Sequence, residues 1–413
     1  MIAELKRLFK WLYPGIGIKR WIGLSAFGVI LLVIGSSGLR SEEFFMLQTL
    51  DWVILSAGIV ILILGFKRLM GSLINAIIPS SRANELVDIL YQRRQLARGP
   101  RIVAVGGGTG LSMLLTGLKE YSSNITAIVT VADDGGSSGR LRQQFDILPP
   151  GDIRNCLVAL ADASTMMRDL FQFRFDSGSE LAGHSFGNLF ITVMTRLTGD
   201  FEKAIRETSK VLALRGQVIP SSLSNVTLAA EYADGSVVEG ENKIPRGHKP
   251  IRKVYLKPEH PAPAPEAIKA IDEAEIIVLG PGSLYTSIIP NLLIKEISDK
   301  IVASRAIKVY VCNVMTQPGE TDGYSASQHV RALVEHSHPG IIDYCIVNTG
   351  KLPVQVLKRY EEGNAYSVVS DRKNIQNMGY RIIEEDTGSV SEGVIRHDHL
   401  KLANIILGLQ EEL

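Results

Sequence analysis

The residues best suited to chemistry begin with a glycine-rich turn near residue 106. The apolar run Ile102–Val105 leads directly into Gly106–Gly110, which reads GGGTG. Glycine permits a tight turn and lets a ligand approach the backbone closely. Backbone amides in such a turn, placed before a helix, cradle phosphate groups. We therefore predict that a ligand's phosphate binds at four successive residues: Gly107, Gly108, Thr109 and Gly110.

This turn departs from two well-known nucleotide motifs. The dinucleotide fingerprint needs glycine at the sixth position of Gly-x-Gly-x-x-Gly, where this chain has Leu111. A Walker A loop ends in Lys followed by Ser or Thr, and that ending is also missing. The pattern thus favours a nucleotide-binding βαβ unit but not ordinary P-loop hydrolysis of a nucleoside triphosphate.

A pair of acids ends the next apolar run. Asp133 and Asp134 follow Ile125–Val131, where the second strand of a βαβ unit ends. Adjacent carboxylates suit two tasks: accepting hydrogen bonds from ribose hydroxyls, or holding Mg²⁺ across a diphosphate. The sequence leaves both open, so the pair is our candidate for a ribose contact and for a metal site.

Further polar loops follow other predicted elements. The segment Gly135–Arg140 (GGSSGR) can form an anion-binding nest. For Asp152 the competing interpretation is a helix N-cap, and for His184 a structural hydrogen bond. Ligands of open parallel sheets bind beyond the carboxyl ends of strands, where several of these loops fall. The candidate binding residues in them are Ser137, Ser138, Arg140, Asp152, Asn155, His184, Asn188, Gly282, Ser283, Asn313 and Thr316.

The elements that must position these loops alternate between strands and helices. The pattern predicts a Rossmann-like α/β fold, with a mostly parallel sheet, helices on both faces and a small antiparallel insertion at about 215–260. We expect Thr109 to cap the first helix and 157–175 to form one helix. The predicted strands of the sheet are 102–105, 125–131, 275–279, 308–313 and 344–348, with a further strand at 365–370.

Composition narrows the class of protein. The 413 residues carry a formal net charge of +1, which disfavours nucleic-acid binding as the main task. The three cysteines are far apart and lack zinc or CxxC spacing, so we expect free thiols in a reducing compartment.

The first hundred residues are of a different kind. Trp21–Leu39 has no charged residue and is long enough to span a bilayer, and a second apolar run covers Trp52–Phe66. Lys and Arg flank the two outer ends, which predicts a two-helix transmembrane hairpin at 1–70 with both termini in the cytoplasm. A cleaved signal peptide and a buried hairpin are the alternatives. A linker at 71–100, whose amphipathic helix is predicted at Ser80–Gly99, then leads to a cytoplasmic domain at 101–413.

Six motifs in order resemble the bacterial gluconeogenesis factor family, YvcK-like, which is related to the 2-phospho-L-lactate transferase CofD. They are VAVGGGTGLSMLLTGLK, ITAIVTVADDGGSSGRLR, PPGDIRNCLVAL, GHSFGNLF, GPGSLYTSIIPNLL and CNVMTQPGETDGYSA, and they lie within residues 101–408. The membrane hairpin is an extension that shorter members lack.

The resemblance implies a Rossmann-like fold, a nucleotide-sugar ligand such as UDP-N-acetylglucosamine, and a role in gluconeogenic growth, cell-wall synthesis and cell shape. A homodimer and partners in cell-wall synthesis are further candidate interactions. In the transferase relatives the glycine turn and acid pair bind a nucleotide-diphosphate substrate and a divalent metal. The tail residues Tyr360 and Arg396 fit the gluconeogenesis-factor branch as ligand candidates.

One departure bears on the activity that the resemblance implies. The transferases have an Asn-Pro pair where this chain has Ser283-Leu284-Tyr285. Two hypotheses therefore remain: a membrane-tethered regulator that binds a nucleotide sugar, and a metal-dependent phospho-transferase.

Overall fold

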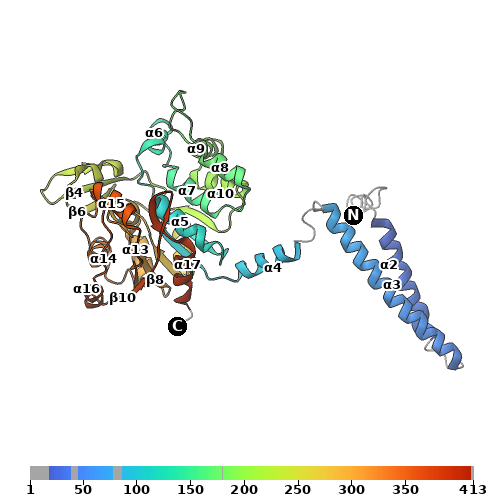
Figure 1. Ribbon diagram of the computed structural model, residues 1–413. Coiled ribbons are helices and arrows are strands. Elements are labelled where there is room, and N and C mark those ends of the chain that lie inside the picture. The colour runs from blue at the N-terminus through green and yellow to red at the C-terminus, as the bar shows by residue number, and fades with distance from the viewer. Residues whose placement is uncertain (1–17, 39–44, 78–85, 179, 411–413) are drawn as a thin grey trace. The chain divides into compact units, whose positions relative to one another are not determined.

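The computed structural model describes residues 18–38, 45–77, 86–178 and 180–410. The chain divides into two compact units, Met1–Arg93 and Arg94–Leu413 (Figure 1). The outer basic residues before Lys19, the hairpin loop and the first residues of the predicted linker helix lie outside the described residues.

The first unit contains two long apolar helices, α2 (Ile18–Gly38) and α3 (Phe45–Ile77), which pack against each other. Glycines allow the close approach, since a Cβ at Gly28 would lie 2.8 Å from the Leu62 nitrogen and one at Gly58 3.0 Å from the Leu32 nitrogen. Outward side chains such as Val33 and Val53 stay exposed. Both helices are long and apolar enough to cross a membrane.

The second unit begins at Arg94, near the end of α4 (Leu86–Ala97). It is built on one parallel sheet. The strand order is β10-β9-β8-β7-β1-β2-β3, and every neighbouring pair is parallel. The strands are β1 (Ile102–Gly106), β2 (Ile125–Val129), β3 (Gln217–Pro220), β7 (Ile276–Leu279), β8 (Ile307–Val311), β9 (Tyr344–Asn348) and β10 (Arg381–Glu385). Strands β1, β2, β7 and β8 are buried throughout because helices cover both faces.

The chain reverses its direction across the sheet between β1 and β7. From β1 it proceeds to β2 and β3, whereas β7 is followed by β8, β9 and β10 on the opposite side of β1. Right-handed crossovers then place the two sets of helices on opposite faces. Helix α5 (Gly108–Leu118) packs with α7 (Gly151–Leu160) and α17 (His399–Gly408) (Figure 1). Helix α11 (Pro265–Glu273) packs with α13 (Lys295–Ala303). The predicted α/β fold is confirmed.

The other elements extend from this frame. A three-stranded antiparallel sheet has the order β5-β4-β6, and β11 pairs with β12 as a hairpin that sequence analysis missed. The strands are β4 (Thr227–Tyr232), β5 (Val237–Glu239), β6 (Ile251–Lys257), β11 (Gly388–Ser391) and β12 (Val394–His397). The remaining helices are α6 (Gly136–Phe145), α8 (Thr165–Gln172), α9 (Phe186–Thr198), α10 (Phe201–Val211), α12 (Ile289–Leu292), α14 (Ala326–Glu335), α15 (Val354–Glu362) and α16 (Arg372–Asn377), with short 3₁₀ turns at Glu241–Lys243 and Pro245–Gly247.

Three local predictions were wrong. Helix α5 begins at Gly108 with Gly107 as its N-cap, so Thr109 lies inside the helix and does not cap it. The helix expected at 157–175 is two helices, α7 and α8, because the backbone is extended at Ala161. The strand expected at 365–370 is an isolated bridge between Ser367 and Met315, since only this short stretch meets the loop after β8.

Candidate functional site

The two glycine turns meet where the strand order reverses. One turn follows β1 and the other, Gly280-Pro281-Gly282, follows β7, its neighbour in the sheet. A Cβ at Gly110 would lie only 2.5 Å from the Pro281 carbonyl oxygen, so the two backbones nearly touch. Open parallel sheets bind ligands at this position, beyond the carboxyl ends of the strands.

A cavity of about 330 Å³ opens beside these turns. Its lining includes nine residues predicted from the sequence: Gly107, Thr109, Gly110, Gly282, Ser283, Asn313, Thr316, Tyr360 and Arg396. Sequence analysis missed the apolar part of the lining, to which Met113, Val314, Met315 and Ile395 belong. We call this space the switch-point cavity.

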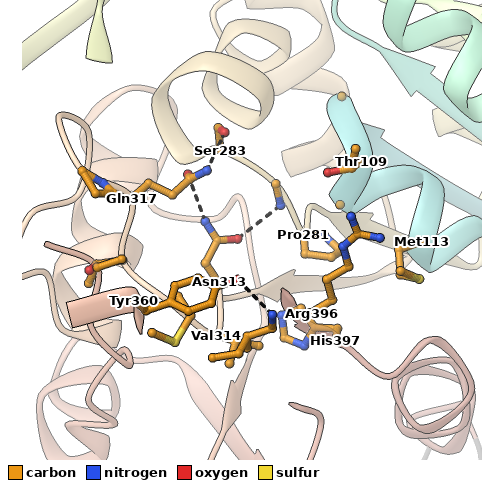
Figure 2. Close-up of a pocket in the computed structure, with 18 residues that line it drawn as sticks. Thr109, Met113, Pro281, Ser283, Asn313, Val314, Gln317, Tyr360, Arg396 and His397 are labelled. Atoms are coloured by element: carbon orange, nitrogen blue, oxygen red, sulfur yellow. Dashed lines mark hydrogen bonds between the residues drawn. The ribbon is translucent and has the colours of Figure 1, made fainter. Parts of the chain in front are cut away.

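A chain of amides fixes the second glycine turn on one wall of the switch-point cavity. The Gly282 N–H donates to Asn313 Oδ1 at 3.3 Å, and Asn313 Nδ2 donates to Gln317 Oε1 at 3.4 Å. Gln317 Nε2 then donates to Ser283 Oγ at 2.9 Å (Figure 2). The loop after β8 thereby holds the loop after β7, which lies next to it because β7 and β8 are paired in the sheet.

The opposite wall comes from the C-terminal hairpin and α15. Tyr360 accepts a hydrogen bond from the Ile395 N–H at 2.9 Å, which ties α15 to β12. Arg396, on β12, extends along the cavity toward α5, near Met113 (Figure 2). His397 is buried between Thr387 Oγ1 and the Cys312 carbonyl, and burial lowers the pKa of its imidazole to about 4. The neutral imidazole is therefore a structural support of this wall at physiological pH.

A second, acidic cavity of about 250 Å³ lies on the other side of Gly107. A Cβ at Gly107 would lie 2.6 Å from Asp152 Oδ2 and 2.7 Å from Thr130 Cγ2, and both residues line this cavity. Its carboxyl groups are Asp133, Asp152 and Glu241. The bare backbone of Gly107 thus separates the two cavities.

The carboxyl groups of the acidic cavity hold protons more tightly than usual. Burial raises the pKa of Asp152 to about 7 and that of Glu241 to about 8, and the charge of Asp133 adds to each shift. Burial also raises the pKa of Asp133. Carboxylates crowded in a low-dielectric space resist ionising together. Near pH 7, Asp152 and Glu241 are therefore each protonated for much of the time.

The predicted acid pair is divided between two tasks. Asp133 faces the acidic cavity and accepts a hydrogen bond from the Gly135 N–H at 2.8 Å. Asp134 instead accepts from the Asn242 N–H at 3.0 Å, which holds the turn after β5 against the sheet. In the cavity Asp133 is joined by Asp152, whose pKa its charge helps to raise, and Asp134 is not part of the lining.

Carboxylate oxygens are the donors that Mg²⁺ prefers, so the chemistry of the acidic cavity fits a hard cation. The carboxylates are not gathered into a finished ligand set, however. Within the residues that the structure describes, no group of three or more His, Cys, Asp or Glu side chains could hold a metal ion.

A buried polar cluster accounts for several other predicted residues. Asn188 Nδ2 donates to Ser137 Oγ at 3.1 Å, and Ser137 Oγ lies 3.0 Å from His184 Nδ1. Ser138 bonds to Asp133, Asn155 Oδ1 accepts from Arg154, and Arg140 donates to the Ala182 carbonyl. None of these six predicted residues (Ser137, Ser138, Arg140, Asn155, His184 and Asn188) lines either cavity.

A buried glutamate that sequence analysis missed supports the loop after β7. Glu320 accepts hydrogen bonds from Thr286 Oγ1 at 3.0 Å and from the Tyr285 N–H at 3.3 Å. These residues belong to a π-helical turn, Leu284–Ile288, whose Thr286 and Ser287 line the acidic cavity. Burial raises the pKa of Glu320 to about 7. Nothing in the sequence around Glu320 signals this contact, because it joins two loops 34 residues apart.

Comparisons with known proteins identify relatives of most or all of the chain. The family model described as 2-phospho-L-lactate transferase CofD matches residues 102–388. A Nostoc protein is 48% identical over 429 residues, covering 98% of this chain and 93% of its own. The gluconeogenesis factor of Bacillus subtilis is 50% identical over 317 residues, covering 77% of this chain and 100% of its own.

A crystal structure of a Bacillus halodurans protein is similar to the second unit. The two chains are 48% identical with a TM-score of 0.74, and the match covers 75% of this chain and 100% of that one. The relative forms this fold without a counterpart of the remaining quarter. We therefore expect the second unit, which has its own buried core, to fold as an independent domain.

Proposed function

Because the chain belongs to the gluconeogenesis factor family and carries a CofD domain, we propose that it binds a nucleotide sugar and regulates carbon metabolism, cell-wall synthesis and cell shape. The ligand of our proposal is UDP-N-acetylglucosamine. The observation that carries the proposal is the switch-point cavity, where both glycine turns, Arg396 and Tyr360 converge.

The lining of this cavity suits the parts of such a ligand. The amides at the start of α5 point out of the helix N-terminus, which attracts phosphate. A guanidinium binds phosphate oxygens through paired N–H groups, so Arg396 is our candidate for the diphosphate. Tyr360 and the apolar side chains, among them Met113 and Met315, offer a surface for a base or sugar ring.

The acidic cavity is the second part of the proposed site. It adjoins the glycine turn across Gly107. Its carboxyl groups would therefore reach a metal ion carried by a bound diphosphate. Asp133 and Asp152 would hold Mg²⁺ there, and the ion would neutralise phosphate charge. Without an ion, the same carboxyl groups accept hydrogen bonds from sugar hydroxyls.

Calorimetry with the purified domain tests the ligand. We expect UDP-N-acetylglucosamine to give saturable heat. Arg396→Gln tests the contact with the diphosphate, and Tyr360→Phe tests the tyrosine hydroxyl. The arginine substitution removes a charge-assisted contact and should weaken binding roughly tenfold or more. Tyr360→Phe keeps the ring and should cost much less. Absence of heat with the wild-type domain would remove this ligand from the proposal.

The CofD match favours one alternative, a metal-dependent phospho-transferase. In that reaction an acceptor hydroxyl attacks the phosphate of a dinucleotide-type donor, and a nucleoside monophosphate leaves. Mg²⁺-dependent release of the monophosphate, lost in Asp133→Asn, would favour the transferase over the regulator. An organism that makes no deazaflavin acceptor has no use for the 2-phospho-L-lactate reaction itself.

We also propose that α2 and α3 tether the domain to the cell membrane. Their length, apolar surface and flanking Lys19, Arg20, Lys67 and Arg68 support a hairpin whose outer ends face the cytoplasm. The domain would then sense its ligand beside the membrane where lipid-linked wall precursors are made.

A further inference from the structure

Three arginines donate hydrogen bonds to one short loop at the surface of the domain. Arg140, on α6, donates to the Ala182 carbonyl at 2.8 Å, and Arg174, after α8, donates to the Gly183 carbonyl at 3.3 Å. Arg154, on α7, donates to Ser185 Oγ. Three separate elements thus bring guanidinium groups to residues 182–185.

These guanidinium groups have no carboxylate partner. Within the described part of the chain, no salt bridge involves Arg140, Arg154 or Arg174. Other basic residues of the domain, such as Arg215, Arg252 and Arg372, each pair with an acid. A guanidinium has five N–H donors. Arg140 and Arg174 each use one of them in a hydrogen bond to a loop carbonyl. Most of their donors therefore remain available to a ligand.

Arg154 is the unusual member of the group. Its side chain is buried, with 6% of the residue exposed, and its Nε has no hydrogen-bond partner. Burial and the nearby charge of Arg174 lower the pKa of Arg154 to about 10, while Asp152 and Asp133 act in the opposite direction. A buried cation without direct compensation is costly, and a bound anion removes that cost.

We propose that Arg140, Arg154 and Arg174, with the loop at 182–185, form a binding site for the phosphate group of a second ligand. Phosphate matches the forked donors of arginine better than other common anions. The site is distinct from the nucleotide-sugar site, because none of the three arginines lines the switch-point cavity or the acidic cavity. The phosphate comes either from a soluble phosphorylated metabolite or from a lipid headgroup.

Inorganic phosphate is the probe for this site. The isolated domain, residues 94–413, carries the background substitution Arg396→Gln so that phosphate binding at the switch-point cavity is weakened. We expect phosphate to raise its melting temperature saturably, compared with sodium chloride at equal ionic strength. Arg174→Gln and Arg140→Gln should each weaken the affinity for phosphate, read from the concentration that gives half of the effect, about tenfold or more. Both residues are exposed, whereas a change at the buried Arg154 threatens folding.

The matched control is Arg331→Gln, which removes the same charge from an exposed position on α14. It should leave phosphate binding unchanged. The proposal is overturned when phosphate gives no saturable effect, or when Arg174→Gln binds phosphate as well as the control does. In a domain that keeps Arg396, Arg174→Gln should leave the heat of binding with UDP-N-acetylglucosamine at the wild-type value, so failure of either site is seen separately.

Flotation with phosphatidylglycerol vesicles distinguishes the two sources of phosphate. Binding of the domain to these vesicles, lost in Arg174→Gln and competed by inorganic phosphate, assigns the site to a lipid headgroup. Phosphate binding without flotation assigns it to a soluble phosphorylated compound. Flotation that Arg331→Gln reduces as much as Arg174→Gln does indicates general charge attraction and overturns the proposal.

Discussion

Replacing Gly110 by alanine tests whether the two glycine turns depend on their close approach. An added Cβ would lie 2.5 Å from the Pro281 oxygen and 2.8 Å from its carbonyl carbon, whereas ordinary contact begins at 3.4 Å. The second turn would have to retreat by the difference, about 0.9 Å. Its retreat would strain the hydrogen bond between the Gly282 N–H and Asn313.

Two effects of this substitution have opposite signs. Alanine in a helix gains roughly 0.5–1 kcal/mol over glycine, which would stabilise α5. Overpacking against rigid backbone costs about 1–3 kcal/mol. We therefore expect a net loss of ~1–2 kcal/mol in the free energy of unfolding. The unit Arg94–Leu413 is larger than 250 residues, so the melting temperature should fall by roughly 1.5–2 °C per kcal/mol.

Thermal unfolding and calorimetry of the same protein samples check both consequences. Gly408→Ala is the control, because Gly408 is also helical but a Cβ there would meet nothing within 4 Å. It should stabilise the domain by roughly 0.5–1 kcal/mol. Gly110→Ala should also weaken nucleotide-sugar binding, because the turn that carries Gly282 and Ser283 moves. If Gly110→Ala instead behaves like the control and keeps its affinity, the contact between the turns does not shape the cavity.

Three further predictions concern pH, a buried amide and the hairpin. The raised pKa values of Asp152, Glu241 and Glu320 favour the folded state at low pH, and this stability is lost as pH rises toward 7–8. The lowered pKa of His397, about 4, destabilises the folded state only below about pH 6.5. The ligand-free domain should therefore melt at a lower temperature at pH 8 than at pH 6.5, and Asp152→Asn should flatten that difference; an unchanged slope would contradict the assignment. Asn291→Ala should cost about 2–3 kcal/mol, measured by denaturant unfolding, because the buried amide donates to the carbonyls of Gly106 and Ser287 and both would lose a partner. The full chain should remain with the membrane after an alkaline wash, and a chain without residues 1–85 should be released while keeping its ligand affinity.

Much of the fold follows from patterns that a single sequence displays. Buried parallel strands are continuous apolar runs, and glycine turns mark where they end. The switch-point cavity was therefore predictable in its polar lining. The sheet order was not, because no local pattern states that β7 lies beside β1.

The differences between the predicted residues and the lining of the two cavities share one cause. Ser137, His184 and Asn188 have the chemistry of ligand-binding residues, but they bond to one another and line neither cavity. Glu241 and Glu320 were missed because they reach the acidic cavity or its support from distant loops. Whether a polar side chain faces a ligand or another side chain is decided by tertiary contacts, which residue type does not reveal.

The altered glycine pattern at β1 now has a physical explanation. In the dinucleotide fingerprint the third glycine lets the helix pack closely. Here Gly110 provides the close approach, and its partner is the second glycine turn; the next residue, Leu111, is buried in the core. Gly107 has an extended backbone, φ −173°, so its glycine is required for space and not for conformation. A side chain there would collide with Asp152 and Thr130, between the two cavities. This bare backbone between the two cavities is what the proposed ligand requires, because it would contact both sides of Gly107.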